Sequence, residues 1–308
     1  MMEKLIVTNA PHIHTSDSSR RIMLDVIIAL LPAAVAAVII FGVKALGVLA
    51  ACVIGAVVSE FLFNLVTHRP QTVGDMSAVV TGLLLGLNLS SAVPLWQCVV
   101  GAAFAVVVVK CLFGGLGHNF ANPAISARVF MLLAFSEVAG GAMPAVVELE
   151  ASATPLELIG SGTEQLPSLM DMFLGLRGGA VGEGCILALL IGYAYLCARH
   201  VIKWYVPAAF VGTVFVLFLA ASGSVTTALY EIMAGGVFIG AIFMATDYVT
   251  TPINNTGRVV FALGCGVITF IIRELCAYPE GVSFSILAMN ILTPYIEKWT
   301  AKKPLGGV

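Results

Sequence analysis

The sequence predicts an all-α polytopic membrane protein with about ten transmembrane helices, arranged as two inverted five-helix repeats with broken third helices. Two observations lead to this fold class. The 308 residues are 59% hydrophobic and only 10% charged, with a mean hydropathy of +1.02, whereas a soluble domain is typically about 25% charged. The apolar residues also gather in runs that fit membrane helices, since about 20 apolar residues cross the roughly 30 Å hydrocarbon core.

Short polar turns separate the apolar runs. In chain order, the expected helices cover residues 22–41, 46–66, 76–89, 94–113, 122–139, 185–198, 204–221, 229–245, 258–272 and 282–299. Five helices precede a long polar segment and five follow it. An odd number of spans per half inverts the two halves relative to each other in the membrane.

The third run of each half is rich in glycine. Gly82 and Gly86 divide the third run, and the corresponding run of the second half is opened by Gly235, Gly236 and Gly240. In many transporter folds, short or glycine-broken segments at matching places mark the functional centre. We therefore expect broken third helices in both repeats.

The basic residues predict the orientation, because lysine and arginine collect on the cytoplasmic side of the membrane. With the N-terminus inside, ten spans return the C-terminus inside and leave few basic residues outside: Lys44, Arg177 and Arg273. The chain then consists of an N-terminal segment with the first repeat (1–139), an outer loop (140–184), and the second repeat with a C-terminal tail (185–308). We expect a multi-pass protein of the cell (cytoplasmic) membrane with both termini cytoplasmic.

The outer loop is the only long polar segment of the sequence. It carries six acidic residues against the single Arg177, and its centre is Thr154, within E-L-E-A-S-A-T-P-L. Composition alone is equally compatible with a solvated loop that has no chemistry. A role for Thr154 therefore depends on the local motif.

The seven cysteines do not form a metal-binding pattern. They lie in or beside apolar runs without a C-x-x-C pair, whereas zinc and iron–sulfur sites need thiolates clustered at short spacing. Free cysteine packs as a small hydrophobic residue. We predict no metal site in this chain alone, and leave open ligands donated jointly with a partner subunit.

Two polar segments within the apolar frame are candidate sites. Residues 114–123 form a glycine-rich turn before a helix, where backbone N–H groups can hold an anion or a polar ring edge; a tight reverse turn is the alternative. Asp247 is ionisable at membrane depth, which is costly and indicates function, unless it caps the end of its helix. Glu60, Asp25 and Arg128 belong to the same class.

Three sequence motifs resemble those of a known protein family. They are L-F-G-G-L-G-H-N-F-A-N-P-A at 112–124, G-A-I-F-M-A-T-D at 240–247 and Y-P-E-G-V-S-F-S-I-L-A-M-N at 278–290. Over nearly its whole length the chain resembles the D subunit of the Rnf ion-pumping ferredoxin:NAD oxidoreductase, and more distantly the B subunit of the sodium-pumping NADH:quinone oxidoreductase.

The resemblance implies FMN joined through its phosphate to a threonine hydroxyl in an outer loop. The family motif D-x-x-S/T-x-A-T falls on residues 148–154 and puts Thr154 at the acceptor position. Glu148 replaces the leading aspartate and Ala151 replaces a hydroxyl residue, so Ser152 and Thr163 are alternative acceptors. A separate flavin transferase installs the flavin in this family.

Further expectations follow from the resemblance. Relatives hold a second flavin, riboflavin or FMN, noncovalently, and Asn119, Phe120 and Asn122 are the candidate contacts here; Ser152 is a further contact beside the covalent site. Asp247, Glu60 and Glu280 are candidate acids of a Na⁺ or H⁺ path. The implied partners are membrane lipid and other Rnf subunits, namely membrane partners, the flavin-bearing G subunit and the iron–sulfur B and C subunits, and not nucleic acid.

The chain shows neither a Rossmann fingerprint nor cluster cysteines nor an acid–base triad, so chemistry on NAD or ferredoxin must lie in another subunit. We accordingly predict an electron-transfer subunit without catalytic residues of its own. The competing hypotheses are a secondary transporter or solute channel, which inverted repeats would equally support, and a structural membrane anchor. Bound flavin would distinguish the first hypothesis from the other two.

Overall fold

The structure, a computed structural model, describes residues 18–135, 156, 159, 166–276 and 281–301. Its regular elements are helices. Three of them, α1, α2 and α10, are long and apolar enough to cross a membrane, and a bent pair formed by α11 and its continuation would make a fourth span. Many large apolar side chains on these helices are exposed, including Ile39, Ile54 and Val216. The prediction of an all-α polytopic membrane protein is confirmed.

The described residues of the first half, 18–135, form five helical segments. These are α1 (Ser19–Phe41), α2 (Val43–Val66), the short η1 (Val73–Asp75) with α3 (Ser77–Leu87), α4 (Leu95–Ala103) continued by the π-helix η2 (Phe104–Cys111), and α5 (Pro123–Ala134). Gly42, at φ 74°, ends α1 and lets the chain turn directly into α2. Asn122 caps α5, and Pro123 occupies its first turn, where a missing N–H costs nothing.

The second half follows a short helix, α8 (Leu169–Leu174). It contains α9 (Ile186–Ala198), α10 (Tyr205–Ser222), α11 (Val225–Met233), α12 (Val237–Ile239) with the π-helix η3 (Gly240–Met244), α13 (Asn255–Leu275) and α14 (Val282–Thr300). The helices expected from the apolar runs are therefore present, with ends within a few residues of the predicted ones where the structure describes them. The expected outer loop contains α8, which hydropathy did not predict.

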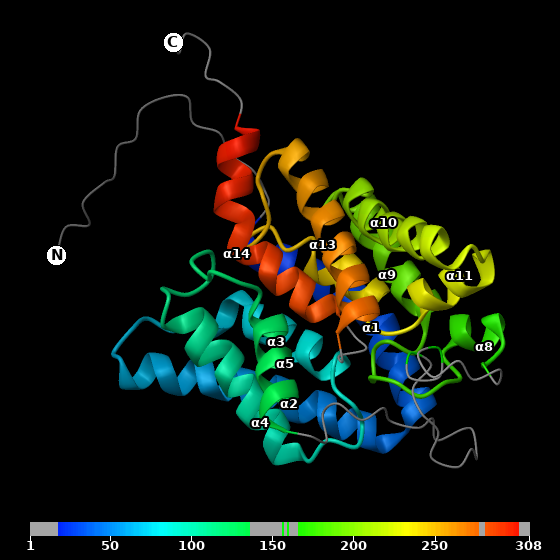
Figure 1. Cartoon of the computed structure of the whole chain (residues 1–308). Helices are drawn as coiled ribbons and strands as arrows, with labels where there is room; N and C mark the ends of the chain where they lie inside the picture. The colour runs from blue at the N-terminus through cyan, green and yellow to red at the C-terminus, as the bar shows by residue number, and fades with distance from the viewer. Residues whose placement is uncertain (1–17, 136–155, 157–158, 160–165, 277–280, 302–308) are drawn as a thin grey trace, which may run out of the picture.

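The two halves lie side by side. Figure 1 shows α2 to α5 on one side and α9, α10, α11 and α13 on the other. Two helix pairs join them: α1 packs against α9, and α5 packs against α14. The cavities described below lie where these halves meet.

The third segments of the two halves are interrupted in different ways. Gly82 and Gly86 do not divide α3, so that prediction was wrong: α3 is continuous, and the interruption falls at Met76, whose φ is 66°, between η1 and α3. A Cβ at Gly82 would lie 2.6 Å from Val53 Cα, so this glycine allows α3 to contact the α2 backbone. In the second half the predicted break is present, with a bend of 65° between α11 and α12.

The end of the expected outer loop packs inside the protein. The N–H of Val181 donates to Leu89 O (2.9 Å) and that of Gly182 to Leu87 O (2.6 Å), which gives partners to carbonyl groups at and just beyond the end of α3. Arg177 and Glu183 are each only 4% exposed. Residues 180–183 and the charged side chain of Arg177 are thus buried against the helices, although they belong to the expected outer loop.

Candidate functional site

A cavity of about 450 Å³, here called the mouth cavity, opens between the glycine turn, the turn after η3 and α14. Phe120 comes from the first of these segments, Tyr248 from the second and Asn290 from the third. The aromatic side chains of Phe120 and Tyr248 are 47% and 43% exposed. The glycine turn reaches this position through left-handed backbone at Gly114, Gly115 and Gly117, which favours glycine.

Unsatisfied amide groups line the mouth cavity. Asn290 is 2% exposed, and both its Oδ1 and its Nδ2 have no hydrogen-bond partner among the residues that the structure describes. Asn119 donates to Ala121 O (3.3 Å), while its buried Oδ1 likewise has no partner in the described part of the chain. Because an unmet buried polar group costs about 1–3 kcal/mol, these atoms indicate a site that a polar ligand would complete.

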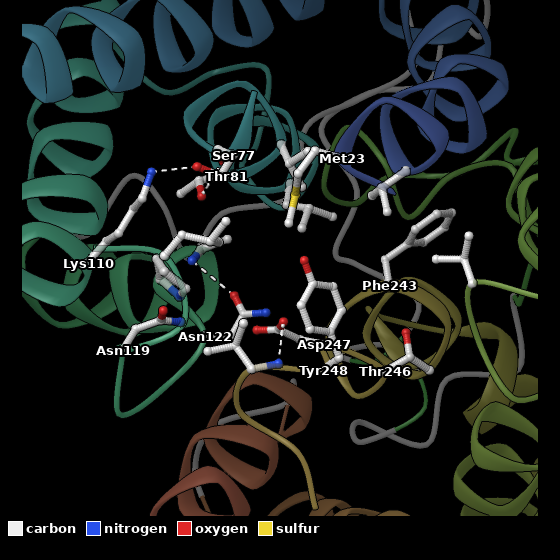
Figure 2. Close-up of a pocket in the computed structure, with 18 of the residues that line it drawn as sticks. Met23, Ser77, Thr81, Lys110, Asn119, Asn122, Phe243, Thr246, Asp247 and Tyr248 are labelled. Atoms are coloured by element: carbon white, nitrogen blue, oxygen red, sulfur yellow. Dashed lines mark hydrogen bonds between the residues drawn. The ribbon is translucent and has the colours of Figure 1, made fainter. Parts of the chain in front are cut away.

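A second, smaller cavity of about 90 Å³, here called the inner cavity, shares Asn119, Tyr248 and Val249 with the mouth cavity. Figure 2 shows Asn119, Asn122, Asp247 and Tyr248 around the same space, with Lys110 and Ser77 on another side of it. Its lining comes from both halves, including α1, α3, η2 and the turn after η3. Asn122 is less available than Asn119, because its Oδ1 caps α5 by accepting from the N–H groups of Ala124 (3.0 Å) and Ile125 (3.3 Å).

Asp247 lies in the turn that follows η3, outside the helical spans. Its carboxylate accepts from Val249 N–H (3.2 Å) and the Thr250 hydroxyl (3.0 Å), and it lines the inner cavity. Burial raises the pKa of this carboxyl above its ordinary value, and the two hydrogen bonds oppose that shift. Asp247 therefore both closes a turn and presents an ionisable group to the cavity.

Glu60 belongs to a polar cluster beside the inner cavity, here called the Lys110 cluster. Its members are the buried Glu60, Ser77 and Lys110, the partly buried Asp75 and the exposed Thr72. Glu60 Oε1 accepts from Lys110 Nζ at 2.8 Å and from the Thr72 hydroxyl at 2.6 Å. Lys110 Nζ also donates to Ser77 Oγ (2.5 Å), whose hydroxyl donates to Asp75 Oδ1 (2.5 Å). Two of the five members, Lys110 and Ser77, line the inner cavity.

A second buried group of charges surrounds the α11–α12 break, and we call it the arginine cluster: Arg128, Arg177, Glu183, Glu231 and Arg273. Arg177 donates to Met233 O (2.6 Å) and Glu183 O (3.0 Å), and Arg273 donates to Glu231 O (2.6 Å) and Ala234 O (3.1 Å). Arg128 bridges Glu183 (2.9 Å) and Asn88. Burial lowers the pKa of Arg177 to about 10 although Glu183 opposes this, so it stays charged at neutral pH.

Leu156 packs onto this break. It is 9% exposed and contacts the buried Met172 and Ala234. A Cβ added at Gly235, whose φ is 63°, would lie 2.8 Å from Leu156 Cδ1 and 3.0 Å from Arg273 Nη2. Leu156, which follows Thr154 by two positions in the sequence, is therefore held against the α11–α12 break.

Comparison with known proteins identifies the family of this chain. The model of the NQR2, RnfD, RnfE family matches residues 6–306. The chain belongs to this family. It is 44% identical over 306 residues to the D subunit of the Na⁺-translocating ferredoxin:NAD⁺ oxidoreductase complex of Acetobacterium woodii, covering 98% of this chain and 95% of that protein.

Other members of the family are similar over almost the same length. Identity is 37% to the D subunit of the proton-translocating ferredoxin:NAD⁺ oxidoreductase complex of Clostridium ljungdahlii, covering 97% of this chain and 96% of that protein. It is 34% to the D subunit of the ion-translocating oxidoreductase complex of Stutzerimonas stutzeri, with 93% and 92% covered. The family resemblance predicted from the three sequence motifs is confirmed.

The structure brings some of the predicted site residues together. Asn119 and Phe120 line the mouth cavity, Asn122 and Asp247 line the inner cavity, and Glu60 lies one side chain behind it. Thr154, Ser152 and Glu280 lie outside the described residues. Asp25, instead of facing a cavity, accepts hydrogen bonds from Tyr195 and Arg199 between α1 and α9.

Sequence reasoning missed two residues of the site. Lys110 was used only to orient the chain in the membrane, yet it is 2% exposed and paired with Glu60. Its position directly after four valines was the sequence signal that could have indicated a buried lysine. Asn290 stood within a quoted motif and was given no role, although an amide in an apolar helix signals a buried polar contact. Within the described ranges, no three His, Cys, Asp or Glu side chains group as a metal site.

Proposed function

We propose that this chain is the membrane subunit of an ion-translocating ferredoxin:NAD⁺ oxidoreductase complex and relays electrons through FMN attached to Thr154 by a phosphoester bond. The observation that carries the proposal is the end-to-end similarity to D subunits of such complexes, at up to 44% identity among the relatives named above. The chain would act within a complex, because chemistry on ferredoxin and NAD⁺ requires sites that other subunits provide. Those partners are further membrane subunits, a flavin-bearing G subunit and the iron–sulfur B and C subunits.

The covalent flavin would be attached by a separate transferase. Thr154 is preferred over Ser152 and Thr163 because it is followed by Pro155 and Leu156 in the order typical of D subunits. Docking of Leu156 at the α11–α12 break supports a fixed place for the flavin-bearing segment. When bound, FMN supplies one- and two-electron transfer, while the phosphoester tether gives the ring a high effective concentration next to its electron partners.

We place a second, noncovalent flavin, riboflavin or FMN, in the mouth cavity. Its volume, about 450 Å³, lies within the roughly 300–1,000 Å³ typical of ligand pockets, whereas the inner cavity is too small for a three-ring system. Phe120 and Tyr248 offer aromatic faces for stacking. Asn119 and Asn290 offer unsatisfied amide groups to the polar ring edge. Asn122 is committed to capping α5, so we do not propose it as a primary contact.

The ion path would run along the junction of the halves. Asp247 faces the inner cavity and Glu60 lies behind Lys110, while Glu280 is a candidate outside the described residues. Buried acids of this kind in a membrane protein mark ion or proton routes. The transported ion would be Na⁺ or H⁺, as in the named relatives.

We also propose the inverted five-helix repeats predicted from the sequence. Their first helices, α1 and α9, pack together, as do their last, α5 and α14. A π-helix occurs in each half, η2 and η3, and both third segments are interrupted, although at different places. With both termini cytoplasmic, a cysteine replacing Lys203 should add labelling by a membrane-impermeant thiol reagent from inside only, and one replacing Lys44 from outside only, each measured against the same chain with its native cysteines alone, of which Cys276 is exposed. The reverse pattern would overturn the orientation.

The deciding experiment detects covalent flavin. The chain is co-expressed with a flavin transferase and run on a denaturing gel under ultraviolet light. We expect fluorescence that survives denaturation, is absent in Thr154→Ala and persists in the matched controls Ser152→Ala and Thr163→Ala. Loss of fluorescence in one of those controls instead would move the acceptor to that residue.

A dark wild-type band despite active transferase would contradict the covalent flavin. Absence of noncovalent flavin as well would then favour the second candidate, a secondary transporter. The 65° bend in the α11–α12 span and the cavities between the halves support that alternative, since broken helices line the substrate sites of many transporters. Solute uptake by flavin-free liposomes containing this chain would establish it.

A further inference from the structure

Lys110 is a buried cation that the proposed electron relay and ion path have not used. It lies in η2, a π-helix of eight residues, and its whole residue is 2% exposed. π-helical turns are rare and frequently occur at functional sites. A lysine in an apolar span is costly to bury, so its position requires specific partners.

Those partners are arranged so that Lys110 is shared. Its ammonium group donates to Glu60 Oε1 (2.8 Å) and to Ser77 Oγ (2.5 Å), and the Ser77 hydroxyl in turn donates to Asp75 Oδ1. Glu60 Oε2 is buried and has no hydrogen-bond partner within the described part of the chain. Glu60 therefore has capacity for a further cation beside the lysine.

The other charges near this cluster do not replace Lys110. Arg69 donates to Cys111 O (2.9 Å) and does not contact Glu60 through a hydrogen bond in the structure as described. Asp247 faces the inner cavity, with its carboxylate held by Val249 and Thr250. Lys110 is thus the positive group that pairs directly with Glu60.

The cavities connect Lys110 to the proposed noncovalent flavin. Lys110 and Ser77 line the inner cavity (Figure 2), and the inner cavity meets the mouth cavity at Asn119, Tyr248 and Val249. The order in space is mouth cavity, inner cavity, Lys110 and Glu60. Negative charge in the mouth cavity would therefore attract the ammonium group away from Glu60, and at low local dielectric such an attraction is strong.

We propose that Lys110 is the charge-coupling residue that links flavin reduction to cation uptake at Glu60. When an electron from the complex adds negative charge in the mouth cavity, Lys110 turns toward the inner cavity and leaves Glu60. Glu60 then takes up one Na⁺ or H⁺. When the electron leaves, Lys110 returns and expels the cation. Each cycle moves one electron and one cation, and Lys110 keeps its proton. With Na⁺ no covalent bond changes; with H⁺ one O–H bond forms at Glu60 on uptake and breaks on release. The flexible four-carbon stem of Lys110, with its three donors, suits this motion.

This inference rests on the proposed function, and its test uses the whole complex. Wild type, Lys110→Met, Lys110→Arg and the control Lys44→Met are purified with their partner subunits. Lys44 is exposed at the N-terminal end of α2, whereas Glu60 lies near the C-terminal end of the same helix. Three quantities are measured: the noncovalent flavin per complex, the midpoint potential of that flavin, and the cations moved per electron in liposomes.

We expect Lys110→Met to lower the midpoint potential, because a nearby positive charge favours the reduced, more negative flavin. Electron transfer should continue while cations moved per electron fall at least tenfold. Lys110→Arg should keep the potential near that of wild type, since it keeps the charge, and lose part of the coupling, since its planar group is less mobile. Lys44→Met should match wild type in all three quantities.

Because Lys110→Met leaves Glu60 buried without its cation, it could prevent assembly. The double variant Glu60→Gln with Lys110→Met removes both charges and should assemble, transfer electrons and move few cations. Wild-type coupling in either variant would overturn the role of Lys110, as would a double variant that holds flavin but transfers no electrons. A wild-type complex without noncovalent flavin would instead overturn the flavin site itself, and the coupling role with it.

Discussion

The arginine cluster and the Lys110 cluster are both buried groups of charge, and they differ in what surrounds them. In the arginine cluster the guanidinium groups bond to carbonyls and carboxylates that fix a broken helix, as Arg273 does with Glu231 and Ala234. In the Lys110 cluster the lysine itself lines a cavity, whereas no member of the arginine cluster lines the mouth cavity or the inner cavity. The first arrangement holds a shape, and the second leaves room for charge to move.

The largest effect should come from breaking the arginine cluster. Glu183→Ala leaves Arg128 buried without its carboxylate, and breaking a buried pair in this way typically costs about 3–5 kcal/mol. Chemical unfolding in detergent measures the change. The control Glu274→Ala removes an exposed carboxylate of α13 and should alter stability little; equal effects of the two variants would contradict the structural role assigned to the cluster.

The next effect concerns the contact between Leu156 and the helix break. Gly235 and Gly223 have nearly the same φ, 63° and 66°, but an added Cβ meets Leu156 only at Gly235 and open space at Gly223. Both alanine variants carry the same backbone strain, and only Gly235→Ala also overpacks against Leu156. Gly235→Ala should therefore lower the free energy of unfolding by about 1–3 kcal/mol more than Gly223→Ala does. It should also reduce covalent flavin on the denaturing gel.

If Gly223→Ala proved equally harmful to stability and flavin attachment, the contact with Leu156 would have no special importance. Unfolding curves and gel fluorescence of the same two preparations provide both readings.

A smaller effect is expected at the pair that joins α1 to α9. Arg199 bonds to Asp25 at 3.2 Å, but its side chain is 41% exposed, and solvent-exposed pairs contribute about 0.2–1 kcal/mol. Arg199→Met should therefore destabilise far less than Glu183→Ala. A double-mutant cycle with Asp25→Asn measures the coupling energy, and a value above that of the buried Arg128–Glu183 pair would reverse the comparison.

The smallest effect on stability should come from Asn290→Leu. Its amide has no partner within the described residues, so replacing it with an apolar group of similar size should be nearly neutral or slightly stabilising without flavin. Retention of noncovalent flavin through purification should nevertheless fall. Unchanged flavin content would remove Asn290 from the proposed site.

The sequence predicted the helices well because membrane burial leaves a strong signal. The runs at 22–41 and 46–66 match α1 and α2 closely, since a long apolar segment has few alternatives in lipid. The break before α12 was also predictable, because Gly235 and Gly236 stand together. The family, and with it the proposed acceptor Thr154, came from motifs and not from hydropathy.

The remaining features depend on contacts between distant segments. Lys110 and Glu60 are 50 positions apart, and neither hydropathy nor local spacing pairs them. Arg177 and Glu183 look like loop residues, but both are buried, because Arg177 donates to Met233 O at the end of α11 and Glu183 pairs with Arg128 of α5. Gly82 shows the converse error: glycine permits a break, but here it serves close packing against α2.

The bend between α11 and α12 also has an electrical consequence. A helix carries partial negative charge at its C-terminus and partial positive charge at its N-terminus. Arg177 and Arg273 meet the carbonyls that end α11, while a Cβ at Gly236, just before α12, would lie 3.0 Å from a Glu183 carboxylate oxygen. Each helix dipole therefore ends on a side chain of opposite sign. This pairing stabilises both ends of the break electrostatically, and the three arginines against two glutamates of the arginine cluster leave a net positive charge at the joint.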